Sequence, residues 1–257
     1  MQKIGKSHSI IKLFKETIKT NKHKNWICTD DLEVLSLALN HQLTISYLLY
    51  SSEENYHEET KELLKKLIEA SKETYEISND TYQLIQTKEN HAGIIAIIEL
   101  PTYELKDLGS FLLVLDRLEI PGNIGTIYRT ADACGVEGIL LVDSITKPHN
   151  PKLTASARGT NLIIPTVSLS YEEAQTFLLN NNYTIYLGEP KLGKDYQAYS
   201  YQGKIAIVVG NERFGINEKW YYQNHQKVFI PMVGNNNSIN VSVAASILAY
   251  EAFMKRK

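Results

Sequence analysis

The chain has 257 residues, of which 43% are hydrophobic, and its formal net charge is −2. This length suits one large domain or two small ones, and the apolar content suffices for a buried core, which argues against a disordered chain. The near-neutral charge argues against a strongly basic nucleic-acid-binding protein. Any surface for a nucleic acid must therefore be a local patch.

Cysteines and apolar runs indicate the compartment. Cys28 and Cys134 are the only cysteines, and their wide separation fits neither a disulfide framework nor a zinc site. The first residues lack an apolar stretch of signal-peptide length, and no apolar run reaches the roughly 18–20 residues of a membrane helix. We therefore expect a cytoplasmic protein that holds no metal and does not enter a membrane.

The first hundred residues alternate between helical and strand patterns. Apolar residues recur at helical spacing in segments 10–19, 32–40 and 58–70. Asp30 or Asp31 could cap the second of these helices, and Asn79 or Asp80 could cap a short helix that ends at Ile85. Short apolar runs predict strands at 26–29, 45–50, 75–77 and 94–100. This alternation predicts a small α/β sandwich with parallel strand pairing.

A second alternation follows a polar segment at 101–110, which contains Pro101 and Gly109 and interrupts the periodicity. We expect strands at 111–115, 138–142, 184–187, 205–209 and 228–230, and helices at 124–134, 171–179 and 241–253. Gly135 is placed to end the first of these helices. The chain therefore divides into domains at residues 1–103 and 104–257.

Three short motifs in the second half lie where an expected strand gives way to a helix or a turn. The first is Asn123-Ile124-Gly125 followed by Arg129. In a purely structural interpretation Asn123 caps the helix and Arg129 pairs with Asp132. In a functional interpretation Arg129 lies near a strand's carboxyl edge, where its guanidinium could bind a phosphate with two hydrogen bonds.

The second motif is Gly210-Asn211-Glu212, and the third is Ser238-Ile239-Asn240-Val241. Gly210 would let a ligand approach the backbone closely, although a plain turn with Glu212 at a helix N-terminus is an alternative. Ser238 or Asn240 could simply cap the last helix. Strand ends are where α/β proteins place ligand sites, so all three motifs could meet at one edge.

In this order and spacing the three motifs resemble those of the SpoU (TrmH-type) RNA ribose 2′-O-methyltransferases of the SPOUT superfamily. The resemblance implies an S-adenosylmethionine-dependent enzyme, a homodimer, and a C-terminal α/β knot, namely a deep trefoil knot in a mostly parallel sheet. It implies catalytic roles for Asn123, Arg129, Glu212, Ser238 and Asn240. It implies methyl-donor contacts at Leu187, Gly188, Gly210, Asn211, Ile230, Met232, Ser238 and Ile239.

The chain departs from the family pattern at two places. Glu119-Ile120 stands where a Gln-Asp pair is usual, and Arg213-Phe214 follows the second motif where small glycines are common. The small-residue segment 155–159 matches the one that precedes the family's next strand, expected here at 162–165. These departures bear on the identity of the substrate and leave the expected reaction unchanged.

Residues 26–100 resemble the substrate-binding domain that precedes the methyltransferase domain in many members, especially those acting on ribosomal RNA. The 1–103 domain is therefore expected to bind RNA, and ribosomal RNA is the favoured substrate. A transfer RNA 2′-O-methyltransferase and a non-catalytic RNA-binding adaptor are the alternatives. A Rossmann dinucleotide enzyme is disfavoured, because no Gly-x-Gly-x-x-Gly follows a strand. Candidate phosphate contacts, which could also be a solvated helix face, are Lys12, Lys15, Lys19, Lys22, Lys24 and Arg158.

Overall fold

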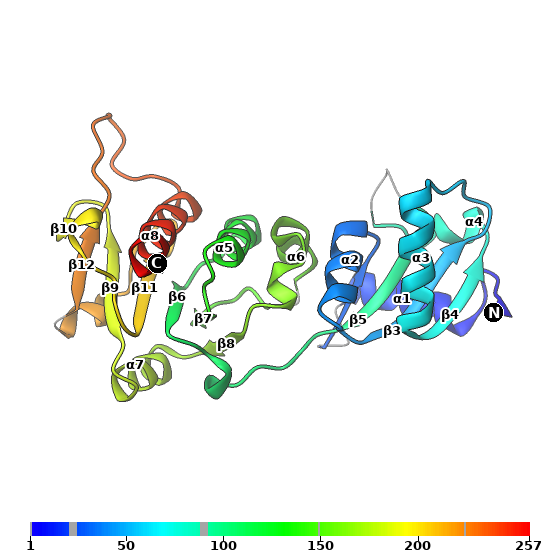
Figure 1. The fold of residues 1–257 in the computed structure, drawn as a ribbon, viewed down its shortest axis with the longest axis horizontal. Coiled ribbons are helices and arrows are strands. Elements are labelled where there is room, and N and C mark those ends of the chain that lie inside the picture. The colour runs from blue at the N-terminus through cyan, green and yellow to red at the C-terminus, as the bar shows by residue number, and fades with distance from the viewer. Residues whose placement is uncertain (1, 21–24, 88–91, 149, 224) are drawn as a thin grey trace. The chain divides into compact units, whose positions relative to one another are not determined.

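The computed structural model describes residues 2–20, 25–87, 92–148, 150–223 and 225–257, and the chain forms two compact units (Figure 1). The N-terminal unit comprises Met1–Thr102 and His149–Ile163, and the C-terminal unit comprises Tyr103–Pro148 and Ile164–Lys257. This division lies one residue from the expected boundary. The segment 149–163, however, groups with the N-terminal unit although it lies inside the expected 104–257 domain.

The N-terminal unit contains a five-stranded sheet with the order β1-β4-β3-β5-β2. Its strands are β1 (Gln2–Lys3), β2 (Trp26–Thr29), β3 (Ile45–Ser51), β4 (Ser71–Ile77) and β5 (Ile94–Glu99). β4 runs parallel to β1 and β3, whereas β5 is antiparallel to both β2 and β3. The expectation of parallel pairing was therefore wrong for β5, because periodicity reports which faces of a strand are buried and not its direction.

Helices cover both faces of this sheet, so the expected α/β sandwich is confirmed. They are α1 (Ser9–Thr20), α2 (Leu32–Asn40), α3 (Glu58–Ala70), α4 (Asn79–Tyr82) and α6 (Pro151–Ala157). Leu35 of α2 and Leu67 of α3 pack on one face, and Phe14 of α1 and Tyr82 of α4 pack on the other. Of the two residues expected to cap α2, Asp30 and Asp31, it is Asp31 that does so.

Two local expectations in this unit were wrong. Ser78 caps α4 in place of Asn79 or Asp80, because its hydroxyl accepts from the Thr81 N–H. The strand expected at 162–165 is instead the end of a 3-10 turn, Thr160–Leu162, whose Leu162 is buried in the same cluster as Leu35. The apolar residues that suggested a strand are thus explained by packing against the N-terminal unit.

The C-terminal unit contains a seven-stranded, fully parallel sheet with the order β10-β12-β9-β11-β6-β7-β8. Its strands are β6 (Phe111–Asp116), β7 (Gly138–Val142), β8 (Thr166–Leu169), β9 (Thr184–Glu189), β10 (Lys194–Asp195), β11 (Ile205–Gly210) and β12 (Gln226–Phe229). The expected α/β class with a mostly parallel sheet is confirmed. The trefoil knot stays a prediction from the family resemblance.

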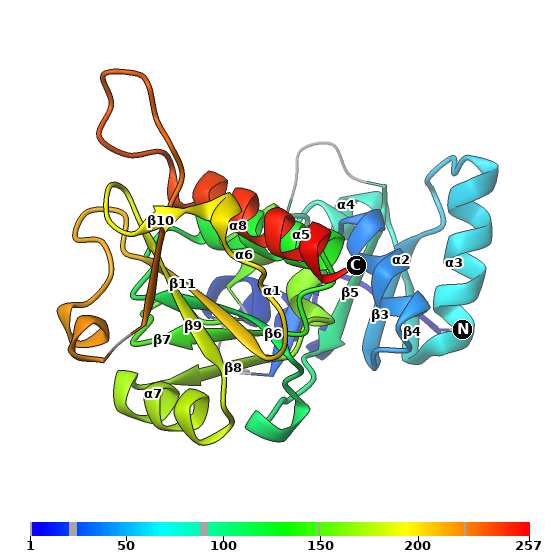
Figure 2. The same cartoon turned by 60° about the vertical axis from the view of Figure 1, so that its left-hand side comes forward.

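Three helices flank this sheet: α5 (Pro121–Ala133), α7 (Tyr171–Asn180) and α8 (Val241–Arg256). α5 and α8 lie side by side over one face, and α7 lies against the other (Figure 2). Hydroxyls of Thr130 on α5 and Ser246 on α8 are 2.7 Å apart and hydrogen-bonded. Gly135 follows α5 with a φ of +64°, as expected of a residue that ends a helix.

No helix in the described part of the chain is both long and apolar enough to cross a membrane.

Candidate active site

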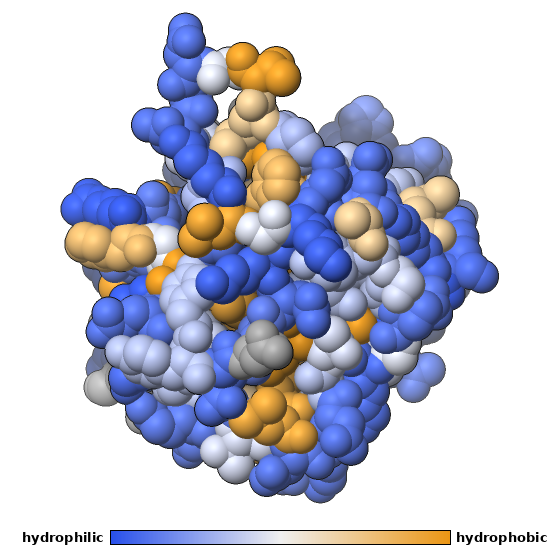
Figure 3. All heavy atoms as spheres, turned by 90° about the vertical axis from the view of Figure 1, so that its left-hand side faces the viewer, coloured by the Kyte–Doolittle hydropathy of each residue, from blue (hydrophilic) through white to orange (hydrophobic). Residues whose placement is uncertain are grey.

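A cavity of about 650 Å³ lies at the carboxyl ends of β9 and β11, within the C-terminal unit. Its walls come from the start of α5, from the turn at 210–216 and from the segment between β12 and α8. That last segment projects from the sheet as an open loop in both ribbon views (Figures 1 and 2). Figure 3 faces this side of the unit and shows hydrophobic atoms at the loop's tip and in patches among hydrophilic side chains.

Two glycines keep the cavity open. A Cβ atom on Gly210 would lie 2.2 Å from the backbone of Gly215 and Ile216, so only glycine lets the turn fold back there. That turn is closed by two backbone hydrogen bonds between Asn211 and Gly215, at 3.0 and 2.9 Å. A Cβ atom on Gly188 would lie 3.1 Å from Leu248 of α8 and would reduce the space between β9 and that helix.

One chain of hydrogen bonds joins the three sequence motifs. The Asn123 side-chain amide donates to Glu212 Oε1 at 3.0 Å, and its carbonyl oxygen accepts from Asn240 Nδ2 at 3.1 Å. Asn240 in turn accepts from the backbone N–H of Ser242 at 2.8 Å and so caps α8. Residues far apart in sequence are thereby fixed side by side at the wall of the cavity, and their remaining polar atoms can bind a ligand.

Glu212 also supplies the acceptor at the beginning of α5. Its carboxylate accepts from the backbone N–H of Ile120 at 3.3 Å and of Glu119 at 3.4 Å. The expectation that Asn123 caps this helix was wrong, because α5 begins at Pro121 and Ile120 is its N-cap. No side chain of the N-cap residue caps this helix, and the Glu212 carboxylate, from the turn after β11, accepts the N–H of that N-cap residue instead.

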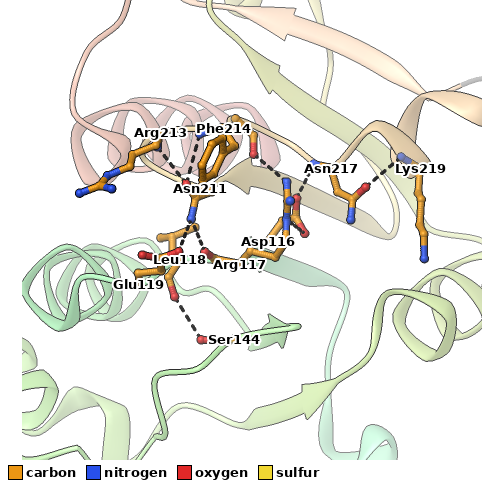
Figure 4. A network of polar contacts seen from close by, with 11 residues as sticks. Asp116, Arg117, Leu118, Glu119, Ser144, Asn211, Arg213, Phe214, Asn217 and Lys219 are labelled. Carbon is orange, nitrogen blue, oxygen red and sulfur yellow. Dashed lines mark hydrogen bonds and ion pairs between the residues drawn. The ribbon is translucent and has the colours of Figure 1, made fainter.

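Asn211 connects the two loops beneath the cavity (Figure 4). Its side-chain amide donates to the Arg117 carbonyl at 2.7 Å and to the Glu119 carboxylate at 3.1 Å. Its carbonyl oxygen accepts the backbone N–H groups of Arg213 at 2.9 Å and Phe214 at 3.2 Å. Because Asn211 is buried, these four bonds satisfy the amide and fix the course of the turn.

Asp116 supports the same turn and was missed in the sequence. It is fully buried at the end of β6, and its Oδ2 accepts the Asn217 N–H at 2.6 Å. Burial raises the pKa of Asp116, and this N–H and the nearby Arg117 guanidinium oppose the rise. An aspartate that directly ends a buried apolar strand was the available signal, since a buried carboxylate must have polar partners.

The cavity brings together ten of the residues expected at the site. They are Asn123, Gly188, Gly210, Asn211, Glu212, Ile230, Met232, Ser238, Ile239 and Asn240. Sequence reasoning gave no role to Glu189, Arg213 or Phe214, which also line it. Glu189 is half-buried, and loss of solvent raises the pKa of its carboxyl group.

Two expected site residues lie away from this cavity. Leu187 is fully buried in the core against α7, because Gly188 faces α8 and successive strand residues point to opposite faces. Arg129 is exposed on α5 and makes no hydrogen bond or ion pair with any residue that the structure describes, Asp132 included. Among the residues that the structure describes, no hydrogen bond or ion pair therefore accounts for this arginine.

The expected basic residues belong to the N-terminal unit. Lys12, Lys15 and Lys19 follow one another along α1, whereas Lys22 and Lys24 lie outside the described residues. Arg158 is ion-paired with Glu33, its Nη1 lying 2.7 and 2.8 Å from the two carboxylate oxygens. A phosphate would have to compete with Glu33 for Arg158. The described residues contain no cluster of three or more His, Cys, Asp or Glu side chains suited to a metal ion.

Residues 110–250, more than half of the chain, match the SpoU rRNA Methylase family. The chain belongs to the SpoU rRNA Methylase family. The resemblance inferred from the three motifs is thereby confirmed. The matched span contains β6 to β12 and the first part of α8, up to residue 250, and it includes every cavity-lining residue.

Two bacterial proteins are similar to this chain over most of their length. A protein of Bacillus subtilis, 23S rRNA (guanosine(2553)-2′-O)-methyltransferase RlmP, is 30% identical over 183 residues, which cover 71% of this chain and 73% of that protein. A Staphylococcus aureus protein described as a putative TrmH family tRNA/rRNA methyltransferase is 33% identical over 180 residues, covering 65% of this chain and 71% of that protein.

Solved structures extend the similarity to nearly the whole chain. The SpoU methyltransferase AviRb from Streptomyces viridochromogenes superposes with a TM-score of 0.82 at 25% identity and covers 97% of this chain and 98% of its own. The AdoMet-bound rRNA methyltransferase from Sinorhizobium meliloti superposes with a TM-score of 0.83 at 22% identity, covering 98% and 96%. The fold of both units is therefore shared with these proteins.

Proposed function

We propose that the protein is an S-adenosylmethionine-dependent RNA ribose 2′-O-methyltransferase that acts on ribosomal RNA. The observation that carries this proposal is the cavity at the ends of β9 and β11, where hydrogen bonds join Asn123, Glu212 and Asn240. Membership of the SpoU family and the 23S rRNA 2′-O-methyltransferase activity of the RlmP relative support the same reaction. A ribosomal RNA substrate would place the reaction in the cytoplasm.

The cavity fits the methyl donor in size and in chemistry. Its volume of about 650 Å³ lies within the range of small-molecule sites, and apolar side chains alternate with a few polar groups. Ile230, Met232 and Leu248 would hold the adenosine beside Gly188 and Gly210, where an added side chain would collide with neighbouring atoms. When bound, S-adenosylmethionine supplies a methyl group made electrophilic by the sulfonium.

The chain's own residues would hold the ribose hydroxyl and stabilise the charge that develops on it. Asn123, Ser238 and Asn240 can orient the 2′-oxygen, because Asn123 and Asn240 are already fixed by their mutual hydrogen bond. Glu212 keeps the Asn123 amide in place. We assign Arg129 to the RNA phosphate and to the developing negative charge, since a guanidinium with a pKa above about 12 is a poor base.

The exposed position of Arg129 supports a homodimer. α8 lies against α5 and carries Val243, Tyr250 and Met254 as large exposed apolar side chains. These residues are spaced seven and four apart, so they follow one side of the helix. Apolar side chains of this size on one helix side suit a two-fold contact with a second copy, which would bring Arg129 to the second copy's cavity.

Two measurements test the proposal. Calorimetry in the presence of a chelator should show S-adenosylmethionine binding, and no heat at millimolar donor would overturn the enzyme assignment. Tritiated methyl transfer should then label ribosomal RNA in preference to transfer RNA. Donor binding without transfer to any RNA would favour the adaptor, and preferential labelling of transfer RNA would favour the alternative substrate.

A further inference from the structure

Phe214 is an exposed aromatic residue at the opening of the cavity. Its side chain is 75% exposed and it lines the cavity, whereas most aromatic side chains of the C-terminal unit are buried or half-buried. Leaving a phenylalanine of this size in water forgoes about 2 kcal/mol of burial energy. A single exposed apolar residue is common, so the inference depends on what fixes Phe214 and on what lies beside it.

The backbone beneath Phe214 is held rigidly. Its N–H donates to the buried Asn211 side chain, and so does the N–H of Arg213 (Figure 4). The closed Asn211–Gly215 turn and the contact that excludes any side chain at Gly210 leave this backbone little freedom. The backbone position from which the ring extends is therefore fixed relative to Glu212 and the cavity.

Arg213, the residue before Phe214, adds a positive charge to the same turn. Its side chain is exposed, and Figure 4 shows it extending away from the Asn211 network. It forms no ion pair with any part of the chain that the structure describes. An unpaired guanidinium beside an exposed aromatic ring suits a nucleic acid, because the ring can stack on a base while the arginine binds a phosphate.

We propose that Phe214 and Arg213 bind the nucleotide that is methylated: its base stacks on the Phe214 ring and the adjoining phosphate pairs with Arg213. This inference rests on the proposed function. A ribose hydroxyl reaches a closed cavity only if its nucleotide leaves the neighbouring stack, which costs stacking energy. The Phe214 ring replaces the lost neighbour at the position where the hydroxyl must meet Asn123 and Glu212.

Phe214→Leu tests the role of the ring, because leucine keeps the apolar character without an aromatic face. We expect the KM for ribosomal RNA to rise about fivefold to a hundredfold, the range that loss of one base stack supports. The donor Kd, measured by calorimetry, should not change. Phe214→Trp, which keeps an aromatic face, should have the same KM for ribosomal RNA as the unchanged protein. Tyr222→Leu is the matched control, since Tyr222 is equally exposed, at 76%, and does not line the cavity.

Fluorescence provides a readout that does not depend on turnover. Emission of the F214W variant should be quenched by RNA in a saturable way, beyond any quenching of Trp26 and Trp220 in the unchanged protein. Arg213→Gln should lower the slope of log affinity against log salt by about 0.7–0.9, the loss of one phosphate contact.

The outcomes separate this inference from the proposed function. If the unchanged protein binds no donor and transfers no methyl group, the proposed function fails. If it is active and Phe214→Leu has an unchanged KM for RNA, or the F214W variant shows no added quenching, only the inference fails. If Phe214→Leu instead shifts the oligomeric state at unchanged affinity for RNA, the ring contacts a second copy, and the nucleotide assignment is overturned.

Discussion

Both units carry polar groups at the carboxyl ends of parallel strands, yet they use them differently. In the N-terminal unit, where β3 and β4 end, Ser51 donates to the Asn79 side chain at 2.5 Å and the Asn79 N–H donates to Glu53. The Tyr56 hydroxyl bonds to the carbonyls of Ser51 and Gly93 and closes this end. Here the polar groups form their hydrogen bonds with one another.

In the C-terminal unit, similar groups surround a cavity. Gly188, the second-to-last residue of β9, and Gly210, the last residue of β11, have no side chains, and the network of Asn123, Glu212 and Asn240 borders the cavity. The difference shows that a strand edge becomes a ligand site through the absence of side chains as much as through the polar residues present. Four experiments challenge that comparison, in decreasing order of expected effect.

Gly210→Ala should have the largest effect. Its Cβ would lie 2.2 Å from backbone atoms, so the turn must move and the cavity with it. We expect a loss of about 1–3 kcal/mol in the free energy of unfolding, as for overpacking, together with loss of donor binding. Urea denaturation and calorimetry measure the two. Gly5→Ala in the N-terminal unit is the control, since nothing lies within 4 Å of its added Cβ.

Arg129→Ala should reduce methyl transfer by about a hundredfold or more, the cost of removing one group that stabilises transition-state charge. Thermal stability and donor Kd should stay unchanged, because Arg129 is exposed and outside the cavity. Arg129→Lys should also fail, since a point charge does not replace a two-pronged contact. Asp132→Ala on the same helix is the control, and full activity of Arg129→Ala would refute the catalytic assignment.

Lys12, Lys15 and Lys19, changed together to Gln, test whether the N-terminal unit contributes RNA affinity without chemistry. We expect RNA binding to weaken about tenfold at low salt and the difference to shrink as salt rises. Donor binding should not change. Filter binding across a salt series measures this, with Lys61, Lys65 and Lys66 of α3 changed to Gln as a control of equal charge. Equal losses in both variants would show a non-specific effect of charge.

His225 gives the smallest effect and concerns only the C-terminal unit. Burial lowers the pKa of this imidazole below its usual value near 6.5. As the pH falls, His225 is protonated in the unfolded chain before it is protonated in the folded protein. The stability that its neutral form contributes above pH 6.5 is therefore lost as the pH falls through the folded-state pKa. His225→Gln should flatten this dependence in urea melts between pH 5 and 7. An unchanged pH dependence in His225→Gln would refute the assignment.

Much of this comparison was accessible from the sequence, because strand-to-helix alternation and the three motifs are local patterns. The bounds of α2, α3 and β7 were expected to the residue. Partners that come from distant segments were not accessible. At the start of α5, Glu212 accepts a backbone N–H where Asn123 was expected to cap the helix. Asp116 supports the turn at Asn217, and Leu162 packs in the core of the N-terminal unit. Each depends on tertiary contacts that periodicity does not encode.

Locating the transferred methyl group tests the central claim most directly. Ribosomal RNA would be incubated with the protein and trideuteromethyl-labelled donor, digested to nucleosides and analysed by mass spectrometry. We predict label on the ribose 2′-oxygen of one nucleotide, lost in Asn123→Ala while the donor Kd is retained. Label on a base, or unchanged ribose labelling in Asn123→Ala, would contradict the account of this cavity.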